Sequence, residues 1–280
     1  MSRVNRMRQP GRDLPPRRVA IVQARMGSSR FPGKMLAPLA GLPLLQWVLH
    51  RVQQARELDA VVLATTDLPR DRPLVDLAHR LGVASFTGSE TDVLGRFDAA
   101  ASAHAAKVVV RICADNPFIC PGEIDRLLRF FDRSGADYAC NHLDRLGSAY
   151  ADGFGAEVLG ANLLARVAAE ASEPRHREHV TLYLWDHAQR FRLMAVPAPV
   201  ALAHPALRFD VDRPEHLGEL QTLCDRAGLG LDSTAAEVVA AALARGPAAA
   251  LAARGPRRAE TPQNRPKPGL MRESGAWPPS

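Results

Sequence analysis

Short apolar runs alternate with longer amphipathic segments through the middle of this chain. Four of these runs have the length and composition of buried β-strands: 19–22, 60–64, 83–87 and 107–113. After each run, apolar positions recur every three to four residues, which predicts helices at 43–55, 71–81, 92–105 and 121–133. Pro43 and Pro121 stand where helices begin, and Asp71 can cap its helix ahead of Pro73. Strands that alternate with such helices are typical of an α/β protein with a mostly parallel, doubly wound sheet.

The pattern becomes looser after about residue 137. Two strands, a helix and two more strands are predicted there: 138–141, 157–159, 173–187, 191–196 and 207–211. Helices follow to about residue 244. We expect the loose stretch to form a small insert within the α/β domain.

Both ends of the chain differ in composition from the middle. Residues 1–17 and 246–280 are rich in Pro and Arg and lack an apolar period, so we expect disordered basic tails around one domain at 18–245. Residues 1–18 carry a net charge of +5 and residues 254–280 a net charge of +4, against +6 for the whole chain. The part between is therefore mildly acidic. Because the tails lack interleaved aromatic residues and dense charge, we expect no nucleic-acid partner.

Composition places the chain among soluble globular proteins. Hydrophobic residues make up 46% of it, and the sequence has no run of about 18 apolar residues, so no membrane partner is expected. The cysteines form no CxxC pair and sit among apolar residues, which is typical of buried small side chains: Cys113, Cys120, Cys140 and Cys224. The N-terminus lacks the apolar segment of a secretory signal, although its Arg-rich composition leaves a transit peptide open. We expect a cytoplasmic protein.

Polar clusters follow five of the predicted strands. They occupy 25–34, 65–67 and 88–92, and Asp115 and Asp212 follow two later strands. In open α/β sheets, ligands bind beyond the carboxyl ends of the strands. Five polar clusters at one edge of the sheet therefore predict a single active site there.

The richest cluster is the segment QARMGSSRFPGKML, residues 23–36. Its cations are Arg25, Arg30 and Lys34, and the whole chain contains only three lysines. Glycines let a backbone approach an anion closely, and hydroxyls donate hydrogen bonds to it; the segment supplies Gly27, Gly33, Ser28 and Ser29. This set suits a triphosphate, although its spacing matches neither the Walker A loop nor GxGxxG. The alternative is a solvated basic loop.

Three aspartates are candidate metal ligands. Asp115 lies in RICADNP directly after a buried strand, and Asp210 and Asp212 lie in RFDVDRPE at the end of another. Hard carboxylate oxygens suit Mg²⁺, which keeps waters and bridges phosphates. If the last strand continues, Asp210 and Asp212 point the same way. The alternative is that these aspartates cap the helices that follow them.

Two further polar stretches are candidates for binding an acceptor substrate. The segment HREH, residues 176–179, opens a predicted helix, and its two histidines fall three residues apart on it. Acceptor binding, a metal site and ordinary helix-end polarity all stay open for this segment. The stretch from Asp152 to Glu157 either lines an acceptor pocket or forms an ordinary turn.

Six segments closely resemble the cytidylyltransferase family. They are QARMGSSRFPGK, ATTD, GSETDVLGRF, VRICADNPFI, REHVTLY and RFDVDRPE, and they occur in order from about Arg18 to Leu220. The family includes the CMP-sialic-acid and CMP-KDO synthetases, and the chain is most similar to the branch of proteins like the spore coat polysaccharide biosynthesis protein F. The resemblance implies a Rossmann-like α/β nucleotidyltransferase fold whose insert serves dimerisation and acceptor binding, and hence a homodimer.

The resemblance also implies an Mg²⁺-dependent transfer of CMP from CTP to an acidic sugar, with release of pyrophosphate, for surface polysaccharide or glycan biosynthesis. The implied catalytic residues are Arg25, Lys34, Asp115 and Asp212. The implied nucleotide-binding residues are Ala24, Arg25, Gly27, Ser28, Ser29, Arg30, Lys34, Thr65, Asp67, Gly88, Ser89 and Arg111. The acceptor would contact Asp152, Glu157, Arg177 and His179, and the metal would be held by Asp115, Asp212 and Asp210.

Four positions depart from the pattern of this branch. Gly155 stands where aspartate is usual and Ala151 where proline is usual. His216 replaces an acidic residue, and Asp210 stands where threonine is common. The first two positions fall in the expected acceptor region, so the identity of the acceptor sugar stays open.

Three other functions stay open at this point. The first is a glycosyltransferase that uses Asp210 and Asp212 as an Asp-x-Asp metal motif, although that motif usually comes earlier in a chain. The second is a non-catalytic nucleotide-binding partner in a glycan-assembly complex. The third is a sugar-1-phosphate nucleotidyltransferase, whose Gly-x-Gly-Thr-Arg type loop is absent from this sequence.

Overall fold

A computed structural model describes residues 17–142 and 146–244 of the chain. The tails expected at 1–17 and 246–280 lie outside the described residues, apart from Arg17, so their disorder stays a prediction.

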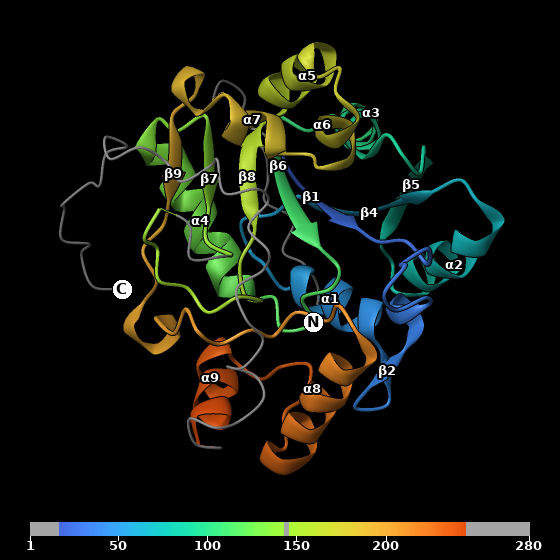
Figure 1. Cartoon of the computed structure of the whole chain (residues 1–280), viewed down its shortest axis with the longest axis vertical. Helices are drawn as coiled ribbons and strands as arrows, with labels where there is room; N and C mark the ends of the chain where they lie inside the picture. The colour runs from blue at the N-terminus through green and yellow to red at the C-terminus, as the bar shows by residue number, and fades with distance from the viewer. Residues whose placement is uncertain (1–16, 143–145, 245–280) are drawn as a thin grey trace, which may run out of the picture.

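A seven-stranded sheet forms the centre of the described part (Figure 1). Its strand order is β5-β4-β1-β6-β8-β7-β9. The strands are β1 (Arg18–Gln23), β4 (Ala60–Thr66), β5 (Ala84–Gly88), β6 (Val108–Cys113), β7 (Tyr138–Cys140), β8 (Glu157–Gly160) and β9 (Leu193–Ala195). All neighbours pair in parallel except β8, which runs antiparallel to both β6 and β7. The expected α/β class with a mostly parallel, doubly wound sheet is confirmed.

Helices cover both faces of the sheet. Successive strand residues point to opposite faces, and the buried strand residues are apolar on both, so each face packs against helices. On β1, Ala20 and Val22 pack in one core cluster, and Val19 and Ile21 pack in the other. The first cluster is covered by α1 (Leu44–Val52), α2 (Arg72–Arg80), α4 (Pro121–Ser134), α8 (Pro214–Ala227) and α9 (Ala235–Leu243). The second is covered by α3 (Val93–Ala103), α5 (Ala161–Glu170) and the short α7 (Leu182–Asp186). A small antiparallel hairpin of β2 (Pro38–Leu39) and β3 (Leu42–Pro43) leads into α1.

The helix predicted at 173–187 is wrong in one respect, because the structure breaks it into α6 (Pro174–Glu178) and α7. His176 Nε2 and Asp186 Oδ2 lie 2.8 Å apart. In a straight helix, residues ten positions apart are separated by about 15 Å along the axis. The break lets α7 fold back, so that Val180 and Leu184 both enter the core.

Two other elements differ from the predictions. Helix α5 was not predicted, because only Leu164 and Val167 are buried on it and so narrow a stripe gives a weak period. The strand predicted at 207–211 does not form, and the segment makes only an isolated bridge between Arg208 and Asp152. The remaining predicted strands and helices are present with ends shifted by a few residues.

The cysteine prediction holds in part. Cys140 and Cys224 are buried, and Cys113 and Cys120 are partly buried. Separately, no helix in the described ranges combines the length and apolar character that crossing a membrane requires.

Candidate functional site

The loop after β1 is held in a compact turn by its own backbone. The Met26 carbonyl accepts hydrogen bonds from the N–H groups of Ser28 (2.9 Å) and Gly33 (3.1 Å). Gly33 has φ of 74°, a left-handed conformation that favours glycine. The Ser28 hydroxyl accepts a hydrogen bond from the Phe31 N–H at 3.2 Å, so Ser28 shapes the loop. The turn ends at Lys34.

Asp71 fixes the start of this loop from outside it. Its buried Oδ1 accepts a hydrogen bond from the Met26 N–H at 2.6 Å, and its Oδ2 accepts one from the Thr66 hydroxyl. Asp71 occupies the N-cap position of α2 but makes no side-chain capping bond there, so the predicted cap is wrong. Its carboxylate instead joins the loop to the end of β4. In the sequence it looked like an ordinary cap, and no spacing signal distinguished the two roles.

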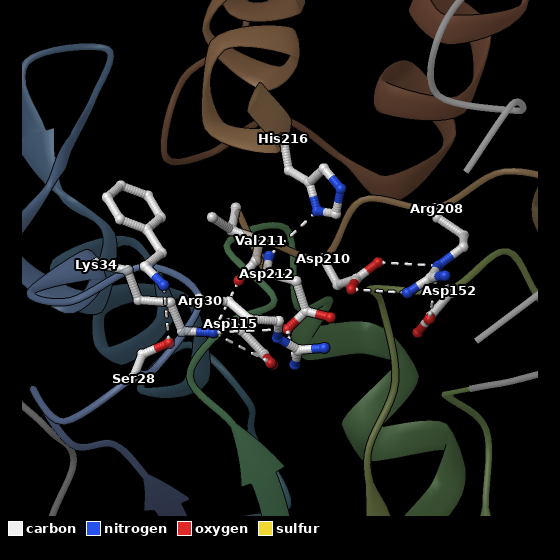
Figure 2. A network of polar contacts seen from close by, with 11 residues as sticks. Ser28, Arg30, Lys34, Asp115, Asp152, Arg208, Asp210, Val211, Asp212 and His216 are labelled. Atoms are coloured by element: carbon white, nitrogen blue, oxygen red, sulfur yellow. Dashed lines mark hydrogen bonds and ion pairs between the residues drawn. The ribbon is translucent and has the colours of Figure 1, made fainter. Parts of the chain in front are cut away.

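Lys34 lies at the centre of a charged cluster that joins three distant segments (Figure 2). Its Nζ donates to the Val211 carbonyl at 2.8 Å, and it lies 3.6 Å from Asp115 Oδ2 and 3.9 Å from Asp212 Oδ1. Arg30 reaches the same Asp212 Oδ1 at 3.0 Å. Three of the sequence clusters, from the first loop, the end of β6 and the segment before α8, therefore meet at one place.

Backbone and side-chain bonds hold the two carboxylates in position. The Val211 N–H donates to the Asp115 carbonyl at 2.8 Å, which ties the last segment to the turn after β6. The Asp212 N–H donates to His216 Nδ1 at 3.2 Å. His216, which departs from the pattern of the resembling branch, thus orients the Asp212 backbone from the first turn of α8.

Asp210 does not join this cluster. Its carboxylate is fully buried and accepts hydrogen bonds from Arg208 Nε (3.1 Å) and Nη2 (2.8 Å). The expectation that Asp210 and Asp212 point the same way is wrong, because the segment is no strand and its side chains do not alternate. Figure 2 shows Asp210 facing Arg208 while Asp212 faces Lys34. Arg208 also lies 3.6 Å from Asp152 Oδ2.

The ends of β4 and β5 lie beside the first loop. Ala24 donates its N–H to the Ala64 carbonyl at 3.4 Å, and the Asp67 N–H donates to the Gly88 carbonyl at 3.1 Å. Thr65 is fully buried, and its hydroxyl has no hydrogen-bond partner among the described residues, whereas Asp67 is exposed. The sequence clusters at 65–67 and 88–92 are thus neighbours of the loop.

The Glu90 and Arg70 side chains lie directly over Gly27. A Cβ added at Gly27 would lie 2.9 Å from Glu90 Oε1 and 3.0 Å from Arg70 Nη2, which form an ion pair. Ser29 is exposed at the far side of the turn. The Ser89 hydroxyl accepts the Asp92 N–H at 3.0 Å, so Ser89 is used in the turn that starts α3.

Arg111 and Glu157 form a buried ion pair across β6 and β8. They stand opposite each other in the antiparallel register. Glu157 also accepts hydrogen bonds from the hydroxyls of Tyr138 (2.7 Å) and Thr181 (3.1 Å). Burial alone would lower the pKa of Arg111, but Cys113 and Glu157 raise it above the ordinary value. Arg111 and Glu157, which were expected to contact the nucleotide and the acceptor, therefore pair with each other.

The segment 176–179 is buried at its start and exposed at its end. His176 is buried against Asp186, while Glu178 and His179 are exposed, so the two histidines do not share a face. Arg177 forms an ion pair with Asp92 at the start of α3. Of the four residues, Glu178 and His179 are accessible from the surface.

The residues around Gly155 leave no room for a side chain at this position. A Cβ added there would lie 1.9 Å from the Asn141 carbonyl oxygen. Asn141 also accepts the Ala156 N–H through its side chain at 2.9 Å, which keeps the two segments together. The absence of the aspartate usual in the resembling branch therefore has a local packing cause. Asp152 is 5% exposed, and its backbone bonds to Leu207 and Phe209.

The Asp115 and Asp212 pair fits a divalent metal that also binds phosphates. Both carboxylates already converge on one cation, the Lys34 ammonium. Within the described ranges, no group of three or more His, Cys, Asp or Glu side chains is placed to hold a metal ion by itself. Mg²⁺ is commonly held by one or two carboxylates, with water and substrate phosphates completing its shell. Asp115 and Asp212 meet that requirement.

One charged residue of the site was missed by sequence analysis. Arg96 on α3 is 2% exposed and donates to the Ser89 carbonyl. Arg96 falls within the resembling segment GSETDVLGRF, but periodicity assigned it only to an amphipathic helix, because hydrophobic spacing does not predict that an arginine is buried.

Known proteins resemble this chain in both sequence and fold. Residues 19–235 match the family model for cytidylyltransferases. The chain is 35% identical over 224 residues to the spore coat polysaccharide biosynthesis protein SpsF of Bacillus subtilis (strain 168), covering 78% of this chain and 91% of that protein. It is 35% identical over 116 residues to the 3-deoxy-manno-octulosonate cytidylyltransferase of Trichlorobacter lovleyi, covering 40% of this chain and 44% of that one.

Solved structures share the fold. A cytidylyltransferase from Leptospira borgpetersenii superposes with a TM-score of 0.76 at 23% identity, covering 82% of this chain and 95% of that one. A CMP:2-keto-3-deoxy-manno-octonic acid synthetase complexed with CTP superposes with a TM-score of 0.55 at 19% identity, covering 75% of this chain and 99% of that one. The nucleotidyltransferase fold expected from the sequence is confirmed.

Proposed function

Because this chain belongs to the cytidylyltransferase family, we propose that it transfers CMP from CTP to an acidic sugar and releases pyrophosphate. The name of one relative supports an acidic sugar of the 3-deoxy-manno-octulosonate type, and the name of another supports a place in surface polysaccharide synthesis. A sialic-acid-like acceptor and a place in other glycan synthesis are part of the proposal through the sequence resemblance. The proposed acceptor contacts are those expected from the sequence, of which only His179 is exposed: Asp152, Glu157, Arg177 and His179. The chain is proposed to act as a homodimer.

One observation carries the proposal: a cationic loop and two carboxylates meet at the carboxyl edge of the sheet. Lys34 lies within 3.9 Å of both Asp115 and Asp212, although these residues come from three different segments. A triphosphate needs several fixed donors, and a metal that bridges phosphates needs one or two carboxylates. Both requirements are met within one cluster.

The side chains suggest how the reaction is assisted. We propose that Arg25, Arg30 and Lys34 bind the phosphates and orient the α-phosphorus toward the acceptor hydroxyl, which attacks in line with the departing pyrophosphate. Asp115 and Asp212 would hold Mg²⁺, which when bound neutralises phosphate charge. Lys34 starts from a position between these carboxylates, so phosphate entry would transfer its ammonium from them to the leaving group.

The geometry does not support the Asp-x-Asp metal motif that the glycosyltransferase alternative requires. It requires Asp210 and Asp212 to act together, but Asp210 is buried against Arg208 and faces away from Asp212. Freeing Asp210 would remove an ion pair from the buried Arg208 charge, which is costly. The Asp115 and Asp212 pair does not carry this penalty.

Pyrophosphate release by the purified full-length chain tests the proposal. CTP, UTP, ATP and GTP would each be incubated with Mg²⁺ and a panel of acidic sugars. We expect release only with CTP and one class of acceptor, and loss of release when the metal is chelated. Release of a nucleoside diphosphate from a nucleotide sugar would establish the glycosyltransferase alternative. Binding of CTP without turnover of any acceptor would favour a non-catalytic partner.

A further inference from the structure

The turn after β5, residues 88–92, is supported by a side chain from outside it. Arg96 on α3 donates through Nη1 to the Ser89 carbonyl. The stem of the same side chain packs over Gly88, where an added Cβ would lie 3.4 Å from Arg96 Cγ and 3.7 Å from its Cδ. Arg96 therefore fixes the backbone of this turn at two consecutive residues.

The other side of the same turn is exposed. Ser89 and Thr91 are exposed residues, whereas Arg96 is only 2% exposed. The turn lies beside the first loop, because the Glu90 side chain lies over Gly27. A molecule bound at the first loop can therefore contact the exposed side of the turn while Arg96 stays enclosed.

The place of the turn on the sheet suits the nucleoside part of CTP. Lys34 and Asp115, a proposed phosphate ligand and a proposed metal ligand, follow β1 and β6. The strand order is β5-β4-β1-β6-β8, and neighbouring strands lie about 4.8 Å apart, so the turn after β5 is roughly 10 Å from the end of β1. Glu157, a proposed acceptor contact, is on β8 at the opposite flank. The flank at β5 is therefore left for the base and ribose.

Burial of the Arg96 charge is poorly compensated. Its Nε and Nη2 have no hydrogen-bond partner among the described residues. Asp71, Glu90 and Asp92 act on the charge from a distance, and each is bonded to other groups. Burial lowers the pKa of Arg96, and the charge of Arg25 lowers it further. An apolar side chain of similar volume would fill the same place without this penalty.

We infer that Arg96 is a positioning residue, which holds the turn at 88–92 in the conformation that binds CTP in preference to UTP. Cytosine presents an amino donor where uracil presents a carbonyl acceptor, so a site distinguishes them only through polar groups that are fixed in place. Arg96 fixes such groups through the Ser89 carbonyl and does not touch the nucleotide itself. This role rests on the proposed function, and it explains why an incompletely paired cation is buried on α3.

Paired measurements of stability and nucleotide binding test this role. Urea unfolding, and calorimetric titrations with CTP and UTP in Mg²⁺, would compare the wild type with Arg96→Met and Arg96→Lys. Arg96→Met removes the donor and the charge but keeps an unbranched side chain over Gly88. We expect its urea midpoint to equal or exceed that of the wild type, while its affinity for CTP falls about 10-fold and its preference over UTP is lost. Arg96→Lys, which keeps a donor, should retain part of the preference.

Arg51 on α1 supplies a matched control, because it is also a buried arginine that donates to backbone carbonyls. It is 2% exposed and donates to the Ile119 carbonyl at 2.7 Å and to the Leu231 carbonyl at 2.6 Å. Arg51→Met should therefore lower the urea midpoint and leave the ratio of the CTP and UTP affinities unchanged.

The outcomes distinguish the role of Arg96 from the proposed function. An unchanged ratio of CTP and UTP affinities in Arg96→Met refutes the positioning role, even if turnover with CTP is intact. A lower urea midpoint with equal losses of affinity for CTP and UTP also refutes it, because a merely structural arginine would act in this way. If Arg96→Met does not fold, Arg96→Lys carries the comparison, and a ratio equal to that of the wild type refutes the role. Preferential binding of CTP by the wild type without turnover of any acceptor would overturn the proposed transfer alone.

Discussion

At the residue scale, the site depends on which charges are paired with each other. The sequence predicted Arg25, Arg30 and Lys34 as one set of cations, but the structure pairs only Arg30 and Lys34 with carboxylates. In the same way, Asp210 and Asp212 looked equivalent, and only Asp212 faces Lys34. Residue types and loop positions were predictable because they are local. Pairing was not, because it depends on which loops meet in the fold.

Replacing Asp115 or Asp212 by Asn should reduce turnover on the order of 100- to 1,000-fold, because each is expected to hold the metal beside the phosphates. Steady-state pyrophosphate release would measure the effect. Asp76→Asn, which changes a partly exposed aspartate paired with Arg72 on α2, is the matched control. Full activity in either site variant would remove that residue from the proposed metal site.

Replacing Asp210 by Ala should lower the free energy of unfolding by about 3 kcal/mol, because it leaves Arg208 with an incompletely paired buried charge. Urea denaturation would measure this difference. A variant with unchanged stability but abolished turnover would contradict the structural role and return Asp210 to the metal site.

At the element scale, periodicity predicted most helices and strands, and it failed where another constraint decided the backbone. Helix 173–187 breaks because α7 folds back onto α6, with His176 bonded to Asp186. Strand 207–211 does not form because its backbone N–H groups bond to neighbouring loops, as that of Val211 does to the Asp115 carbonyl. Hydrophobic spacing predicts neither the break in the helix nor the absence of the strand. The start of α3 at Asp92 was predictable, since the residue type favours a cap.

Asp92 should make stability depend on pH. Partial burial opposes ionisation, but hydrogen bonds from Arg177 and the Gly95 N–H lower the pKa of Asp92 below its ordinary 3.8. A carboxyl whose pKa is lowered by folding stabilises the native state above its unfolded pKa, and this contribution is lost as pH falls through the folded pKa. Asp92→Asn should therefore be less stable than the wild type at neutral pH, with a gap that narrows below about pH 4. A gap independent of pH in urea denaturation would contradict this role.

Gly155→Ala should destabilise the chain by about 3 kcal/mol or prevent folding, because the new Cβ would overlap the Asn141 carbonyl. Gly160→Ala is the matched control, since a Cβ there meets nothing within 4 Å. Thermal unfolding of both variants would measure the difference. Equal midpoints would show that the Asn141 segment can move away, and would leave room for the aspartate usual in related chains.

At the scale of the whole molecule, the sheet brings the sequence clusters to one edge. The parallel strands β1, β4, β5 and β6 place the loops after them side by side, as the topological rule predicts. The expected single site is therefore a consequence of strand order, which the alternation of strands and helices already indicated. The antiparallel β8 was not foreseen, because an isolated four-residue strand carries no information about its direction.

The contact between Lys34 and Val211 joins residues 177 positions apart in the chain. Activity that depends on this contact can appear only after both segments have folded. Most helical contacts are local and form early, whereas a contact of such long range must wait until the intervening segments are arranged. During synthesis, the first loop leaves the ribosome long before its partners at 211 and 212. On refolding from urea, we therefore expect far-UV circular dichroism to recover before turnover does. Simultaneous recovery would mean that the sheet and the catalytic centre form in a single step; a lag would make activity a reporter of completed folding.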